Sequence, residues 1–189
     1  MSQAASVSLR PVEPGDLPLF FEHQRDPIAV AMVAYDSRDR AAFDQHWAKI
    51  LADETGLIRT IVATFDDLPE SQEHVAGNIV SWNSHGQREI GYWIDRAYWG
   101  RGVATAALSG FLRLEQTRPL HAGVAKHNAA SIRVLQNCGF TFLASAAGAS
   151  EDADDSHVLL VLTDRDWIWK PRSQKEGLNQ EHGGWAPAG

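Results

Sequence analysis

The feature that most constrains this chain is the stretch Glu89–Leu108. It begins with an apolar, aromatic run at Ile90–Ile94, which predicts a strand. The loop that follows ends in Gly100-Arg101-Gly102, and an alanine-rich helix begins at Val103. A strand that leads through glycines into a helix exposes backbone N–H groups at the positive end of the helix dipole. Because glycine also lets the backbone approach an anion closely, we expect a phosphate-binding loop here.

The glycine loop alone does not identify the ligand. No Gly-Lys-Ser/Thr follows it, so it is not a Walker loop. The third glycine of the dinucleotide fingerprint is missing, and the chain upstream is not a βαβ unit. Glycines between a strand and a helix are also common turn residues. A second motif is therefore needed to choose between these interpretations.

The second motif is Asn128–Phe140, which reads Asn-Ala-Ala-Ser-Ile-Arg-Val-Leu-Gln-Asn-Cys-Gly-Phe. With it, the sequence resembles the GNAT acyl-CoA N-acyltransferases, in particular the branch of Rim-type protein N-terminal acetyltransferases. The segment Trp99–Ala104 matches the family's acyl-CoA loop, Arg/Gln-x-x-Gly-x-Gly/Ala, except at its first position, where Trp is similar to the Rim-type Tyr-Trp-Gly-x-Gly. The later motif matches Asn-x-x-Ser-x-x-Val-Leu-x-x-x-Gly-Phe. The resemblance is sharp over residues 75–142 and diffuse elsewhere.

The 189 residues, 44% of them hydrophobic, suit one domain with its own core. We expect residues 1–170 to form a single acyl-CoA N-acyltransferase domain and the polar, Gly/Pro-rich segment 171–189 to be a flexible tail. A net charge of −7 without a basic run argues against a nucleic-acid partner. We find no secretory signal and no apolar stretch of membrane-spanning length. The single Cys138 fits a reducing compartment, so we predict a cytoplasmic protein.

Hydrophobic periodicity predicts the elements on either side of the glycine loop. Before the loop we expect a strand at 7–12, helices at 17–25, 28–33 and 39–52, and an antiparallel meander of strands at 57–65, 74–82 and 88–94. Asp16 is the expected N-cap of the first helix. After the loop we expect a helix at 103–116, a buried strand at 120–124, a helix at 128–137 ended by Gly139, and strands at 140–144 and 157–162 separated by an acidic loop at 146–155.

This order of elements predicts a mixed α/β fold. The resemblance adds that the central mixed sheet has six to seven strands and is flanked by about four helices. It also implies that two central strands, here 88–94 and 120–124, splay apart to admit the pantetheine arm of the cofactor.

The resemblance implies transfer of an acetyl group from acetyl-CoA to a primary amine, with a protein or peptide N-terminus favoured and a small-molecule amine possible. An α-amino group is deprotonated at a cost of only about 1 kcal/mol near neutral pH, so a well-placed weak base is enough. Glu89 is the first candidate for that base, since many family members carry a carboxylate there that acts through water. A solvated residue beside Arg88 is the alternative interpretation of Glu89.

Ser131 is the candidate donor for the leaving sulfur. It matches the serine of the Rim-type pattern, and the tyrosine that many family members place four residues before Gly-Phe is Leu135 here. A helix-start role beside Asn128 is the alternative interpretation of Ser131. Three acidic or titratable residues near the end of the first helix are candidates for binding a cationic amine: Glu22, His23 and Asp26.

The candidate contacts to acetyl-CoA lie around the two motifs. We expect the oxyanion donor to be a backbone N–H near Trp93 or Ile94. The pyrophosphate contacts are expected to be the Arg101 charge, the Thr105 hydroxyl and the backbone amides of Gly102, Val103 and Ala104. Asn128 is expected to cap its helix and to face the pantetheine amides. The histidines show no ligand spacing, so we predict no metal.

Two other classes of function stay open at this point. A non-catalytic CoA-binding regulatory module would keep the loop without the chemistry, and the missing tyrosine favours it. A nucleotide-binding protein that uses the glycine loop would bind ATP rather than CoA. The sequence leaves open the acceptor and whether the protein is a monomer or a homodimer.

Overall fold

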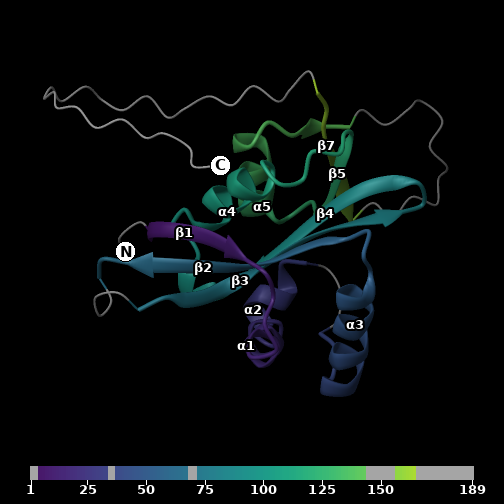
Figure 1. Ribbon diagram of the computed structural model, residues 1–189. Coiled ribbons are helices and arrows are strands. Elements are labelled where there is room, and N and C mark those ends of the chain that lie inside the picture. Colours follow the sequence, from purple (N-terminus) through teal and green to yellow (C-terminus); the bar gives the residue numbers. More distant parts are fainter. Residues whose placement is uncertain (1–3, 34–36, 68–71, 144–155, 165–189) are drawn as a thin grey trace, which may run out of the picture.

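A seven-stranded mixed sheet forms the centre of the protein (Figure 1), with the strand order β1-β2-β3-β4-β5-β7-β6. The computed structural model describes residues 4–33, 37–67, 72–143 and 156–164, so the predicted tail at 171–189 and the predicted loop at 146–155 lie outside it. The strands are β1 (Ala4–Arg10), β2 (Leu57–Phe65), β3 (His74–Ser84), β4 (Gln87–Ile94), β5 (Leu120–Ala125), β6 (Thr141–Phe142) and β7 (His157–Leu162). The helices are α1 (Asp16–His23), α2 (Pro27–Ala31), α3 (Arg40–Ala52), α4 (Val103–Phe111) and α5 (Ala129–Asn137), with a 3-10 turn η1 at Arg96–Tyr98.

Most of the expected elements are confirmed, and two differences arise from tertiary contacts. The predicted helix at 103–116 ends at Phe111, because Glu115 turns back to meet β4. Asp16 is not the N-cap of α1, as we had expected. Its carboxylate instead accepts hydrogen bonds from Arg10, the Glu13 amide and Thr60, and it lies buried in the first turn of the helix.

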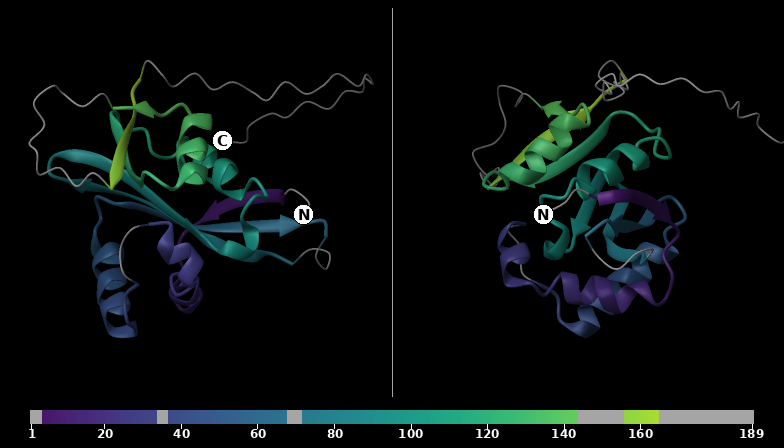
Figure 2. Two further views of the ribbon diagram at one scale, coloured as in Figure 1. Left: turned by 180° about the vertical axis from the view of Figure 1, so that it is seen from behind. Right: turned by 90° about the vertical axis from the view of Figure 1, so that its left-hand side faces the viewer.

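The helices cover both faces of the sheet, with α1, α2 and α3 on one side and α4 and α5 on the other (Figure 2). Each face has its own core. The main one joins the sheet to α4 and α5 and includes Leu108, Phe111 and Leu160. A smaller one joins α1 and α3, through Phe20, Phe43 and Trp47. No helix in the described ranges is both long enough and apolar enough to cross a bilayer.

The sheet divides between β4 and β5. These parallel strands pair only at Arg88 with Leu120 and at Glu89 with His121, which are the first residues of a much longer possible ladder. From there the strands diverge toward their carboxyl ends, where α4 and α5 begin (Figure 1). The splayed central pair that the resemblance implied is therefore confirmed, and we call this divergence the fork.

Candidate active site

The directions of the backbone N–H and carbonyl groups of β4 show which of them face the fork. The N–H of Asp95 donates to Ala76 on β3, whereas the carbonyl of Arg88 faces β5, where it accepts from His121. Since backbone groups of successive strand residues point in opposite directions, the N–H groups of Tyr92 and Ile94 point into the fork. Of the two residues expected to supply an oxyanion donor, Ile94 therefore has its amide directed into the fork.

Trp93 faces elsewhere. Its main chain is turned toward β3, where its carbonyl lies against Gly77. The residue is 7% exposed, and its indole donates a 3.2 Å hydrogen bond to the carbonyl of His23, at the end of α1. Trp93 thus packs α1 against the sheet, and its backbone amide is not available to the fork.

The glycine loop connects the open end of the fork to the start of α4. Gly102 is the N-cap of that helix, with φ +80° and no side-chain cap, and Gly100 has φ +71° with open space where a Cβ would stand. The amides at the start of a helix have no partner inside the helix. Val103 is buried in the main core, while Ala104 and Thr105 are partly exposed beside the loop. The loop therefore presents amides and a hydroxyl in a rigid frame.

Arg101 has a different place from the one expected. Its side chain is 6% exposed, its guanidinium forms an ion pair with Asp67, and it stacks 3.9 Å from the centre of the Phe65 ring. Its carbonyl accepts from the Ala4 amide on β1. The positive charge that we had expected beside a pyrophosphate is thus paired with the end of β2. Arg101 stabilises the loop from behind.

Asn128 and Ser131 are brought together at the start of α5. The Asn128 Oδ1 accepts from the Ser131 amide at 3.0 Å, which confirms the N-cap, and its Nδ2 donates to the carbonyl of Met32 at 3.1 Å. The Asn128 amide therefore links α5 to the end of α2. One amide hydrogen is left for a ligand.

The Ser131 hydroxyl lies 2.8 Å from the hydroxyl of Tyr92, which reaches across from β4. Burial, only partly offset by this hydrogen bond, raises the pKa of Tyr92 to about 12, so the pair holds two protons at neutral pH. Leu135, at the position of the family's usual tyrosine, is buried in the main core. Sequence reasoning missed Tyr92, although its alternation with Ile90 and Ile94 would have placed it on the α5 face.

Glu89 lies on the opposite face of the sheet from Tyr92. It is half-buried, and it is the last β4 residue that pairs with β5. Its neighbour Arg88 points the other way, toward the end of α4, so the two side chains do not share a solvated hairpin end. Glu89 therefore stands at the base of the fork on the α1–α3 side.

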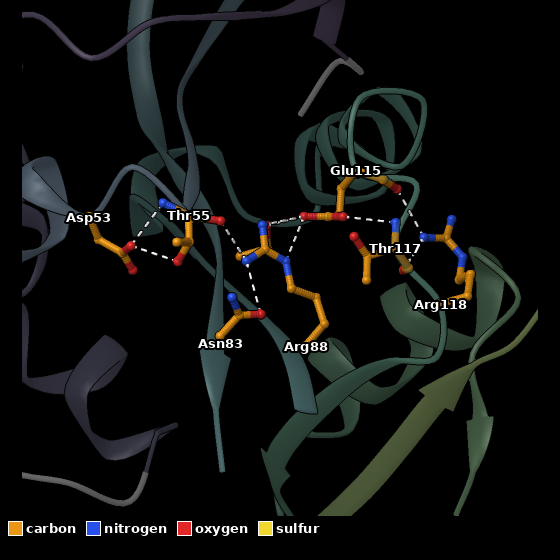
Figure 3. Close-up of polar contacts among 8 residues, drawn as sticks. Asp53, Thr55, Asn83, Arg88, Glu115, Thr117 and Arg118 are labelled. Carbon is orange, nitrogen blue, oxygen red and sulfur yellow. Dashed lines mark hydrogen bonds and ion pairs between the residues drawn. The ribbon is translucent and has the colours of Figure 1, made fainter. Parts of the chain in front are cut away.

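Arg88 belongs to a buried polar network at that base (Figure 3). Its Nε and a terminal nitrogen lie 2.9 and 2.7 Å from Glu115 Oε2, and it also donates to the carbonyl of Thr55. Burial works to raise the pKa of Glu115, but hydrogen bonds from Ser81, the Thr117 amide and Arg88 outweigh it and lower that pKa to about 2. The first residues of β4 are thereby fixed against the end of α4.

An acidic pocket of about 420 Å³ lies where α1 ends against the end of β4. Five residues line it: Glu22, His23, Arg25, Asp26 and Asp95. The His23 ring is 9% exposed with its Nε2 3.4 Å from Asp95, and its Nδ1 is buried without a partner among the described residues. Burial lowers the pKa of His23 against the nearby charges of Asp95 and Glu22, so the ring is neutral and the pocket is net negative.

The helix α2 crosses the open end of the fork on this face. At its start, Asp26 forms a 2.6 Å ion pair with Arg96, just beyond β4. At its end, the carbonyls of Ala31 and Met32 accept from His127 and Asn128, just beyond β5. The described residues contain no group of three or more His, Cys, Asp or Glu placed to hold a metal ion.

Comparison with known proteins agrees with this architecture. Residues 6–141 match the family model described as an acetyltransferase (GNAT) domain. No curated protein sequence matches the chain.

Solved structures with the same fold cover most of the chain. Spermidine N-acetyltransferase from Vibrio cholerae, in complex with CoA and spermine, is 14% identical with a TM-score of 0.65, over 85% of this chain and 96% of that one. RimJ from Mycobacterium smegmatis, in complex with CoA-disulfide, is 23% identical with a TM-score of 0.62, over 86% and 84%. An acetyltransferase from Agrobacterium tumefaciens str. C58 is 19% identical with a TM-score of 0.65, over 85% and 92%. At these identities the likeness establishes the fold alone.

Proposed function

The chain belongs to the GNAT acetyltransferase family, and from that premise we propose that it transfers an acetyl group from acetyl-CoA to a primary amine. The observation that carries the proposal is the fork, which opens one residue beyond Glu89 and leads to the uncapped start of α4. The Tyr98-Trp99-Gly100-Arg101-Gly102 sequence and the Asn128 motif favour the Rim-type branch within the family.

The residues around the fork fit acetyl-CoA. The amides of Gly102, Val103 and Ala104, with the Thr105 hydroxyl, suit a diphosphate because they are oriented by the helix and not consumed by a side-chain cap. The Ile94 amide is turned into the fork, as a donor to a carbonyl oxygen must be. When bound, acetyl-CoA supplies an activated thioester carbonyl.

The chain's own side chains then divide the remaining work. Glu89, at the base of the fork, orients the amine and takes up its proton through water. On the other face, the Ser131 hydroxyl donates toward the sulfur. Tyr92 lies 2.8 Å behind Ser131 and keeps that hydroxyl oriented.

The acidic pocket supports a cationic, extended acceptor. Asp26 is paired with Arg96, and Glu22 with Arg25. The Asp95 carboxylate accepts from the Ala97 amide and lies beside the neutral His23 ring, and no cationic side chain is paired with it among the described residues. Asp95 lies six residues beyond Glu89, or about 20 Å at the rise of a strand. A peptide of about six extended residues spans that distance, and a short diamine does not. We therefore favour a peptide N-terminus with a basic residue several positions along.

One experiment tests the proposed function against its alternatives. Thermal unfolding is followed with acetyl-CoA or ATP, and release of free thiol is then measured with basic and acidic hexapeptides, spermidine and a short diamine. We expect stabilisation by acetyl-CoA and thiol release with the basic hexapeptide. Stabilisation by ATP alone would refute the transferase. Binding of CoA with no thiol release from any amine would instead identify a regulatory CoA-binding module.

A further inference from the structure

His121 is a buried titratable side chain that the proposed mechanism has not used. It is the second residue of β5 and is 7% exposed. Its neighbours Leu120 and Ala122 pack in the main core on the α4–α5 side. Since side chains alternate along a strand, the His121 ring lies on the opposite face, the one that carries Glu89.

His121 and Glu89 are also cross-strand neighbours. They form the last register pair of β4 and β5 before the strands diverge. Side chains of paired residues in parallel strands project to the same face, with the strands about 5 Å apart. The other strand beside His121 places the apolar Val161 opposite it. Glu89 is therefore the ionisable neighbour of His121 across the adjacent strands.

One hydrogen bond defines the state of the His121 ring. Its Nδ1 lies 3.3 Å from the carbonyl oxygen of Arg88. A carbonyl only accepts, so Nδ1 carries the hydrogen, and in the neutral ring Nε2 then bears the lone pair. The Arg88–Glu115 network fixes this carbonyl on the β4 backbone (Figure 3). The hydrogen bond thus selects the tautomer that carries its hydrogen on Nδ1, and Nε2 makes no hydrogen bond within the described part of the chain.

We propose that His121 is a second base of the proposed transfer. Glu89 takes up, through water, the first proton, which the ammonium form of the acceptor loses before it attacks. The Nε2 of His121 accepts, likewise through water, the second proton, which the nitrogen loses as it bonds to the acetyl carbon. The inference rests on the proposed function. In the step, the amine nitrogen forms a bond to the acetyl carbon, the carbon–sulfur bond breaks, the amine proton passes to His121, and the sulfur leaves as thiolate. An imidazole suits this role because it exchanges protons near neutral pH.

The test separates the two nitrogens of the ring. His121→Asn keeps a donor at the place of Nδ1 and removes Nε2, while His121→Gln keeps a polar group near Nε2 that is not a base. His85→Asn is the matched control, because His85 is exposed in the β3–β4 turn at φ +50°, a conformation that Asn tolerates. Each variant is compared with the wild type in thermal unfolding, CoA affinity and single-turnover acetyl transfer.

We expect both His121 variants to bind CoA within about twofold of the wild type and to transfer acetyl about 100-fold more slowly, with no change for His85→Asn. Independently of activity, ¹⁵N NMR of the ring at about pH 8, where an imidazole is ordinarily neutral, is expected to show hydrogen on Nδ1. Hydrogen on Nε2, or transfer by His121→Asn within threefold of an active wild type, would overturn the proposal. An inactive wild type would instead refute the proposed function itself.

Discussion

The Arg88–Glu115 pair makes a stability prediction whose magnitude follows from the structure. Both side chains are buried, at 9% and 4% exposure, and the pKa of Glu115 is lowered from its usual 4.5 to about 2. Each tenfold change in proton affinity is worth about 1.4 kcal/mol, so ionised Glu115 stabilises the fold by about 3 kcal/mol. Glu115→Gln leaves Arg88 buried without its charge partner, which ordinarily costs about 3–5 kcal/mol. We therefore expect a loss of about 3 kcal/mol at neutral pH, or about 6–12 °C in Tm.

The pH dependence gives this prediction its sharper test. The pKa of Glu115 is lower in the folded chain than in the unfolded one, so its contribution is complete above about pH 5 and is lost as the pH falls toward about 2. Urea unfolding of the wild type and of Glu115→Gln, measured at several pH values between about 5 and 2, should therefore show their free energies of unfolding converging as the pH falls.

A matched control is the exposed Arg40–Asp44 pair on α3, whose side chains are 52% and 49% exposed. Asp44→Asn is expected to cost less than about 0.5 kcal/mol. A loss below 1 kcal/mol in Glu115→Gln, or a difference from the wild type that stays constant between pH 5 and 2, would refute the reasoning.

Three further substitutions test the loop, the base and the sheet. Gly102→Val places a branched side chain at φ +80°, which strains the loop by about 1–2 kcal/mol, and the side chain blocks the approach of a phosphate to the loop backbone. Calorimetry should therefore show CoA binding weakened at least tenfold. Gly15→Ala, at an open site, should leave CoA binding unchanged. Glu89→Gln is expected to lower turnover with CoA affinity intact; an equal loss of affinity would remove its chemical role. Gly77→Ala would set its Cβ 1.9 Å from the Trp93 carbonyl oxygen, so urea unfolding should show the free energy of unfolding reduced by more than about 2 kcal/mol. A smaller reduction would show that β3 and β4 can shift apart to accommodate the Cβ.

The fold was predictable where the signal is local. The β-branched run at 57–65 and the apolar run at 157–162 are strands with the expected bounds, and Asn128 caps α5 as expected. Asp16 was misassigned because a tertiary partner, Arg10, competes with the local cap. The splay of β4 and β5 was predicted from the resemblance alone, since no local sequence pattern indicates where two strands stop pairing.

The site was less predictable, because its contacts join residues far apart in the chain. Arg101 pairs with Asp67, and Tyr92 meets Ser131, 34 and 39 residues away. The proposal of Glu89 as the base came from the resemblance to the family and stays a prediction. His121 carries a local signal, its alternation with apolar neighbours, but its partnership with Glu89 depends on the strand register.

The polar contacts around the fork explain how its opening can be held before a ligand arrives. At the base, the Arg88–Glu115 pair fixes the last paired residues of β4. Near the open end, α2 joins the segments just beyond β4 and β5 on one face, and the Tyr92–Ser131 hydrogen bond joins β4 to α5 on the other. Holding the reacting groups in place lowers the activation free energy of transfer substantially, and a displacement of about 1 Å reduces the rate about 100-fold. In the proposed mechanism Arg88 and Glu115 do not touch the reacting atoms. They contribute to the rate by keeping the proposed base, Glu89, and the proposed carbonyl donor, the Ile94 amide, at a constant separation.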